Sequence, residues 1–128
     1  RPGAKAWPTD VCVPISRLAD CIAETRADIE RSGLLAPIVG HVGDGNFHVD
    51  MVLDPENAEE VGRAVDLNER LIARALEMEG TCTGEHGVGY GKIDKLVAEH
   101  GDALDVMRDL KKTIDPLNLM NPGKVVPI

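Results

Sequence analysis

The stretch APIVGHVGDGNFHVDMVL, residues 36–53, decides the fold. Two apolar runs, Ala36–Val42 and Phe47–Leu53, flank the four turn-forming residues Gly43–Asn46. This arrangement predicts a β-hairpin, because glycine, aspartate and asparagine accept the backbone conformations that a tight turn requires. The middle of the chain therefore contributes two antiparallel strands.

Helical periodicity is found on both sides of this hairpin. Residues Ser16–Ser32 carry apolar side chains at helical spacing, and Gly33 is a stop signal. After the hairpin, Asp54 and Pro55 are typical of a helix start, and a broad apolar stripe follows as far as Gly80. The hairpin is thus expected between two amphipathic helices.

The remaining segments complete the predicted fold. A short β-branched run over Asp10–Ile15 predicts a strand, Gly80–Gly91 a strand end plus a loop, and Ile93–His100 a short helix. Another helix is expected after Asp102. The order predicts an α+β fold, a ferredoxin-like β-α-β-β-α-β antiparallel sheet with additional C-terminal helices. At 128 residues, the chain (1–128) is interpreted as a single domain.

Composition excludes several classes of protein. The net charge is −8 and aromatic residues make up 2% of the chain, so binding to nucleic acid is not expected. No apolar run approaches the ~18 residues of a membrane span. The 3 cysteines form no CxxC pair, which favours reduced thiols in a cytoplasmic protein. The opening Arg1-Pro2-Gly3, without an initiator methionine, suggests a segment of something longer.

Two histidines on the predicted hairpin form a first candidate site. A loop of Gly43–Asn46 would place His41 directly opposite His48, with Cβ atoms about 4.5–5.5 Å apart on one face. Two imidazoles at that separation can reach one metal ion. The alternatives are two surface histidines, or one that is buried and hydrogen-bonded.

A second candidate site is the glycine-flanked pair of Glu85 and His86. Adjacent side chains of an extended chain point in opposite directions, so one can bind a metal while the other faces a substrate. With Glu85, the two hairpin histidines would form a set of two imidazoles and one carboxylate, which is the ligand count of an open, catalytic site. The alternative is a glycine-rich turn with two solvated side chains.

Three linked motifs resemble a known family. They are Gly40–His48, Gly80–Gly91 with Gly84–Gly89 at its centre, and Asp115-Pro116 followed by Asn121–Lys124. Together they resemble the C-terminal domain of FAD-linked oxidases, the family of flavin D-lactate dehydrogenase, glycolate oxidase and D-2-hydroxyglutarate dehydrogenase. The D-lactate branch is the most similar. Asp50 departs from the asparagine of D-2-hydroxyglutarate dehydrogenases, which argues against that substrate.

The resemblance implies roles for individual residues. His41, His48 and Glu85 would hold a divalent metal, zinc or manganese, beside the flavin. His86 would be the catalytic base. Asn121 would lie in a terminal loop that packs toward the flavin domain, and it is assigned to cofactor binding.

The resemblance also implies the reaction. The parent protein would oxidise D-lactate, or a similar small 2-hydroxy acid, to the 2-keto acid with FAD and an unknown electron acceptor. The N-terminal FAD-binding domain is missing from this chain, so the chain alone is expected to be colourless and inactive. Two alternatives stay open: a stand-alone metal-binding or interaction module without redox activity, and a metal-dependent hydrolase.

Overall fold

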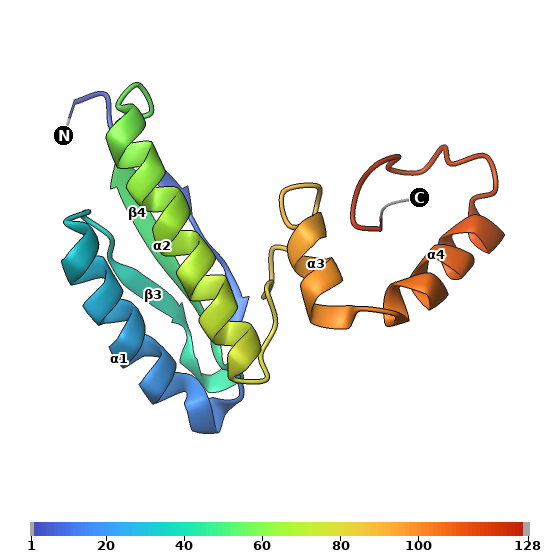
Figure 1. Cartoon of the computed structure of the whole chain (residues 1–128), viewed down its shortest axis with the longest axis horizontal. Coiled ribbons are helices and arrows are strands. Elements are labelled where there is room, and N and C mark those ends of the chain that lie inside the picture. The colour runs from blue at the N-terminus through green and yellow to red at the C-terminus, as the bar shows by residue number, and fades with distance from the viewer. Residues whose placement is uncertain (1, 127–128) are drawn as a thin grey trace. The chain divides into compact units, whose positions relative to one another are not determined.

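The computed structural model describes residues 2–126. The chain forms two compact units, the first ending at Glu85 and the second beginning at His86. Figure 1 shows their helices and strands. The first unit contains β1 (Lys5–Pro8), β2 (Val11–Cys12), α1 (Ile15–Ser32), β3 (Ile38–His41), the 3-10 helix η1 (Val42–Asp44), β4 (Asn46–Leu53) and α2 (Ala58–Glu77). The second contains α3 (Ile93–His100) and α4 (Ala103–Ile114).

Strand β4 is the centre of an antiparallel sheet. It pairs with β3 on one side and with β1 and β2, one after the other, on its other side. An isolated bridge joins Cys12 to Thr81 beyond β2. The lateral order is therefore the Thr81 bridge, β2, β4 and β3, which is the order of a ferredoxin-like sheet. The predicted antiparallel α+β fold is confirmed, with its last strand reduced to one bridge beside glycine-rich sequence.

The strand formed by β1 and β2 along one side of β4 is interrupted at Thr9 and Asp10. Strand β1 was not predicted, because its sequence ends in Pro8 and lacks a clear apolar alternation. An edge strand tolerates proline. The Thr9 amide donates to the carbonyl of Val49 (3.1 Å), and the Val49 amide donates to the Thr9 hydroxyl (2.9 Å). Pairing with β4 thus continues through the interruption while Asp10 becomes buried.

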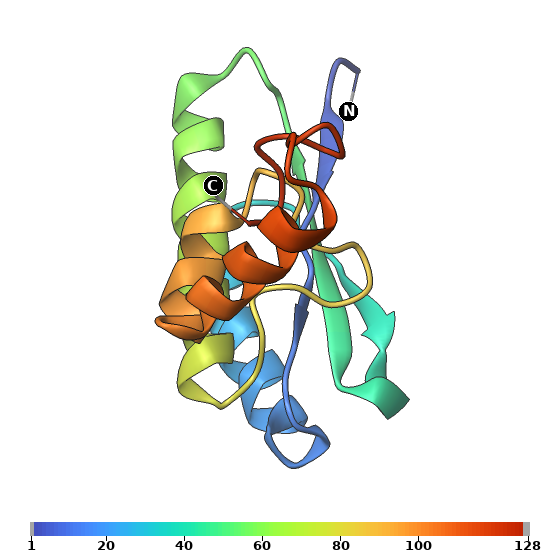
Figure 2. The same cartoon turned by 90° about the vertical axis from the view of Figure 1, so that its right-hand side faces the viewer.

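The two faces of β4 have different roles. Phe47, Val49 and Met51 alternate along the strand and are fully buried in the core. Helices α1 and α2 lie together on the same side of the sheet (Figure 2). Since side chains alternate between faces, Asn46 and His48 lie on the face opposite Phe47. The hydrophobic core and the candidate metal ligands are therefore separated by the sheet.

Helix α2 begins later than the sequence predicted. Asn57 is the N-cap, and its side-chain oxygen accepts hydrogen bonds from the amides of Glu59 (3.1 Å) and Glu60 (3.2 Å). Asp54 belongs to the preceding turn, where its carbonyl accepts from the Asn57 amide. The predicted start at Asp54-Pro55 is wrong because asparagine offers an equally good cap one turn further on.

An ionic cluster joins α1 to α2 at Asp28, whose side chain is 1% exposed. Arg74 donates hydrogen bonds to Asp28, to the Thr25 hydroxyl (3.0 Å) and to Glu24 (2.9 Å). Burial alone would raise the pKa of Asp28, but hydrogen bonds from Arg74 and Arg31 outweigh it and lower the pKa below its usual value. The carboxylate therefore stays charged and holds the two helices together.

Replacing Asp28 by alanine should lower the free energy of unfolding by about 3 kcal/mol, since removing one partner leaves a largely buried arginine charge. The expected value is at the low end of the range for buried pairs because Arg74 retains Glu24. Urea unfolding followed by the fluorescence of Trp7 measures the change. Asp20→Ala, at an exposed aspartate of the same helix, is the control. Equal effects of the two substitutions would contradict the structural role of Asp28.

In the second unit, Asp115 organises the turn that follows α4. Its carboxylate pairs with Lys111 and accepts hydrogen bonds from the amides of Leu119 (2.9 Å) and Met120 (2.8 Å). The hydrogen bond from Lys111, followed by those from the two amides, lowers the pKa of Asp115 to about 2. The charged form is therefore favoured in the folded unit.

Acid should loosen this turn. The contribution of Asp115 is complete above its unfolded pKa of about 3.9. It is lost as the pH falls through the folded pKa of about 2. We expect protection of the Leu119 and Met120 amides from hydrogen exchange to fall between pH 4 and 2, and to be low at all pH values in Asp115→Asn. Asp109→Asn, at an exposed position on α4, should behave like the unaltered chain.

Two further findings concern the described residues. No disulfide bond links Cys12, Cys21 and Cys82 within the described residues. None of the helices within residues 2–126 combines the length and apolarity needed to cross a membrane.

Candidate metal centre

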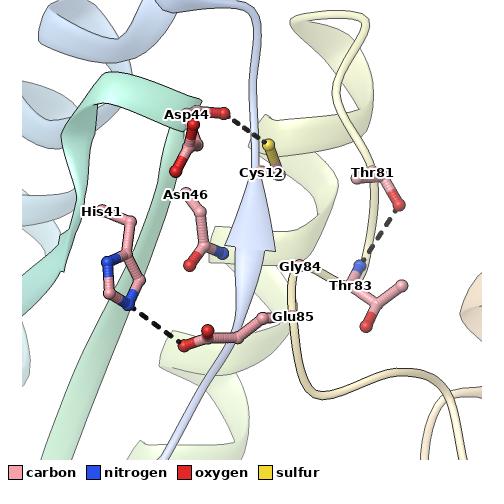
Figure 3. Close-up of a pocket in the computed structure, with 8 residues that line it drawn as sticks. All are labelled: Cys12, His41, Asp44, Asn46, Thr81, Thr83, Gly84 and Glu85. Carbon is pink, nitrogen blue, oxygen red and sulfur yellow. Dashed lines mark hydrogen bonds and ion pairs between the residues drawn. The ribbon is translucent and has the colours of Figure 1, made fainter.

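His41, His48 and Glu85 come together on the sheet face opposite the core. One ligand atom from each lies within 4.8 Å of the other two. Glu85 Oε1 is 3.1 Å from His48 Nε2 and 3.5 Å from His41 Nε2. Figure 3 shows the Glu85 carboxylate and the His41 ring turned toward each other. The three residues proposed as ligands from the sequence are thus neighbours in space.

The predicted register of the hairpin is wrong by two residues. His41 pairs with Asn46, and His48 pairs with Val39. The loop is η1 followed by Gly45, and Gly45 has a φ of 76°. This left-handed conformation ends the loop one residue earlier than predicted, so that Asn46 enters the strand.

The two histidines nevertheless share a face. A shift of two residues preserves the face because side chains alternate with a period of two. The rings are therefore diagonal neighbours, with centroids 6.3 Å apart and planes at 88°. Their separation remains compatible with one shared ion.

His48 is the buried member of the set and is oriented by the interruption between β1 and β2. Its Nδ1 lies 3.0 Å from the carbonyl oxygen of Thr9 and 3.4 Å from Asp10 Oδ1. Both neighbours are acceptors, so the hydrogen-bond network assigns a proton to Nδ1. A metal-binding histidine commonly has such an outer partner, which leaves Nε2 for the ion.

Asp10 ties the segment that carries Glu85 to the sheet. Its Oδ1 accepts a hydrogen bond from Asn46 Nδ2 and its Oδ2 accepts one from the Gly84 amide, each 2.8 Å long. A Cβ atom on Gly84 would overlap both Asn46 and Asp10, so this close approach requires glycine. Sequence reasoning missed the role of Asp10 because it placed this residue at the start of a strand.

A cavity of about 420 Å³ opens beside His41 and Glu85. Cys12 lies in its wall and its Sγ contacts the carbonyl oxygen of Asp44 at 3.3 Å. Burial, followed by the charges of Asp10 and Asp44, raises the pKa of the Cys12 thiol. This shift favours the protonated thiol. The ligand atoms that cluster come from His41, His48 and Glu85, and they are nitrogen and oxygen.

The donor set fits a divalent cation. Two imidazoles and one carboxylate are typical of catalytic sites, in which further positions remain for substrate. Asn46 also lines the cavity, and its Oδ1 is a buried acceptor with no hydrogen-bond partner among residues 2–126. A buried acceptor on the residue paired with His41 is consistent with a site built for a cation.

His86 and Asn121, the other two site residues inferred from the resemblance, belong to the second unit. Both side chains are exposed. Asn121 has a φ of 47°, and its carbonyl accepts a hydrogen bond from the Lys124 amide, which forms the predicted turn. Within that unit, Asn121 and Lys124 line an apolar cavity of about 250 Å³. Their roles stay predictions.

Comparison with known proteins places the chain in a family. Residues 1–125 match the family described as FAD linked oxidases, C-terminal domain. The chain belongs to this family of flavin enzyme domains.

Three relatives are similar to this chain over more than nine-tenths of its length. A probable mitochondrial D-lactate dehydrogenase of Danio rerio is 58% identical over 98% of this chain and 26% of its own length. The D-lactate dehydrogenase [cytochrome] 1 of Saccharomyces cerevisiae is 51% identical over 95% of the chain and 21% of its own length. The glycolate oxidase subunit GlcD of Bacillus subtilis is 34% identical over 91% of the chain and 25% of its own length. The chain thus spans about a quarter of these relatives.

A solved structure supports the fold. The 4-ethylphenol oxidase of Gulosibacter chungangensis, in complex with isoeugenol, matches with a TM-score of 0.71. The match covers 97% of this chain and 25% of that protein at 16% identity. At this identity the likeness concerns the fold alone.

Proposed function

We propose that residues 1–128 form the C-terminal domain, binding substrate and metal, of an FAD-dependent D-2-hydroxy-acid dehydrogenase that converts D-lactate to pyruvate. The observation that carries the proposal is the convergence of His41, His48 and Glu85 within 4.8 Å of one another. The membership of the family and the similarity to D-lactate dehydrogenases support the choice of reaction.

His41, His48 and Glu85 would hold the divalent cation, zinc or manganese. When bound, such an ion supplies Lewis acidity that lowers the pKa of a substrate hydroxyl. On the protein side, Thr9 and Asp10 keep His48 in the orientation that presents Nε2. The Asp10–Gly84 hydrogen bond keeps Glu85 beside the sheet.

His86 would be the catalytic base. Oxidation of a 2-hydroxy acid removes the hydroxyl proton and a hydride from C2, and FAD supplies the hydride acceptor when it is bound. His86 Nδ1 or Nε2 would receive the proton. Because Glu85 and His86 are consecutive, a ligand role for the first brings the second to the same substrate. Asn121 would contribute to the contact with the cofactor.

The remaining partners follow from this assignment. An FAD-binding domain would precede the chain in the whole protein, and a separate electron acceptor would reoxidise the flavin. The cytoplasmic location inferred from the cysteines stays a prediction. The names of the Danio rerio and Saccharomyces cerevisiae relatives place those proteins in mitochondria.

Absorption spectroscopy and elemental analysis of the longer gene product test the proposal. A flavin spectrum bleached by D-lactate, together with about one zinc or manganese ion per chain, is expected. The 128-residue chain alone should bind the ion but remain colourless and inactive. A metal-loaded longer protein without flavin would instead favour a metal-binding module or a hydrolase.

A further inference from the structure

The side-chain oxygen of Asn46, a residue that lines the cavity, has no part in the proposed function. Asn46 is only 5% exposed and lines the cavity beside His41 and Glu85. Its Oδ1 is buried without a hydrogen-bond partner among the described residues. Figure 3 shows the amide oxygen on the side of His41 and Glu85, and the nitrogen on the side of β2.

The orientation of this amide is fixed by its nitrogen. Asn46 Nδ2 donates to Asp10 Oδ1 (2.8 Å) and to the carbonyl oxygen of Val11 (2.9 Å). A flipped amide would place its oxygen against two acceptors, neither of which can donate to it. Oδ1 therefore stays directed away from Asp10 and Val11, and a buried carbonyl oxygen without a partner is costly.

We propose that Asn46 Oδ1 is a fourth protein donor to the cation held by His41, His48 and Glu85. This inference rests on the metal site of the proposed function. Asn46 pairs directly with His41 across the hairpin and lies two residues before His48, so all three side chains leave the same face of the sheet. The carboxylate of Asp10 polarises the amide through Nδ2, which increases the electron density on Oδ1.

A neutral amide oxygen influences which ion is bound. Zinc sites are built from thiolates, imidazoles and carboxylates, whereas carbonyl oxygen suits harder ions such as manganese. Loss of Asn46 Oδ1 should therefore weaken manganese binding more than zinc binding. We expect Asn46→Leu to raise the dissociation constant for Mn²⁺ by about 10–100-fold, the range found when groups supporting a metal site are removed.

Calorimetric titration of the metal-free chain with MnCl₂ and with ZnCl₂ tests this. Asn68→Leu, at a half-buried asparagine of α2, is the matched control and should bind both ions like the unaltered chain. Unchanged affinities in Asn46→Leu would overturn the role of Asn46 while leaving the metal site intact. Absence of binding to the unaltered chain would instead overturn the metal site, and this inference with it.

The substitution Asn46→Leu also removes the hydrogen bonds from Asn46 to Asp10 and Val11. A second measurement leaves these bonds in place. In the unaltered chain with ¹³C-labelled asparagine, saturation with the diamagnetic ion Cd²⁺ should shift the Asn46 side-chain carbonyl resonance more than those of Asn57 and Asn68. A resonance of Asn46 that does not move when the ion is bound would refute coordination by Oδ1.

Discussion

Replacing His86 by alanine should lower turnover of D-lactate by about 10²–10⁴-fold in the flavin-containing protein, the usual contribution of a positioned acid–base group. The metal content should remain nearly unchanged, because Glu85, rather than His86, belongs to the cluster of ligand atoms. Steady-state kinetics and elemental analysis of the same preparation measure the two effects separately.

Two comparisons make this result specific. His100→Ala changes another histidine of the second unit and should leave turnover unaltered. His41→Ala should reduce metal content and turnover together. If His86→Ala loses the metal and recovers its activity when metal is added back, His86 is a ligand and the assignment as base is wrong.

Replacing His48 by alanine should weaken binding of Mn²⁺ or Zn²⁺ to the 128-residue chain by more than about 100-fold. Removal of groups that only support a ligand costs 10–100-fold, and His48 is proposed as a ligand itself. Thr9 and Asp10 also hold the His48 ring in place, and the alanine side chain of the variant offers no ligand atom at that position. Calorimetric titration after removal of metal measures the loss.

Val39→Ala is the control for this prediction. Val39 pairs with His48 across the hairpin and is half-exposed, so its truncation perturbs the same strands without removing a donor. Its metal affinity should stay close to that of the unaltered chain. Equal affinities of His48→Ala and the unaltered chain would show that the cluster does not bind the ion through His48.

The hairpin and the helices could be predicted because their signals are local. Apolar alternation and helical periodicity are properties of short windows of sequence. The register was missed because it depends on the left-handed backbone of one residue, Gly45. The start of α2 was missed because Asp54 and Asn57 are both good caps, and sequence alone does not choose between them.

The candidate site, like the fold, could be predicted from the sequence only in part. His41 and His48 could be grouped because the error of two residues in register did not change the face of either side chain. Asp10 and Asn46 were missed because their hydrogen bonds join residues 36 and 74 positions apart. Such hydrogen bonds form only after the sheet has formed, so no short sequence pattern predicts them.

The position of Asp10 would link the proposed cation binding to folding. One carboxylate joins β4, through Asn46, to the segment at Gly84, so the ligands converge only when both have docked. A cation that binds this folded arrangement and not the unfolded chain stabilises it by mass action, by about 2.7 kcal/mol at a free concentration 100 times the dissociation constant. The melting temperature of the first unit should therefore rise with cation concentration, so the ion would act as a structural element of the domain in addition to its proposed chemical role.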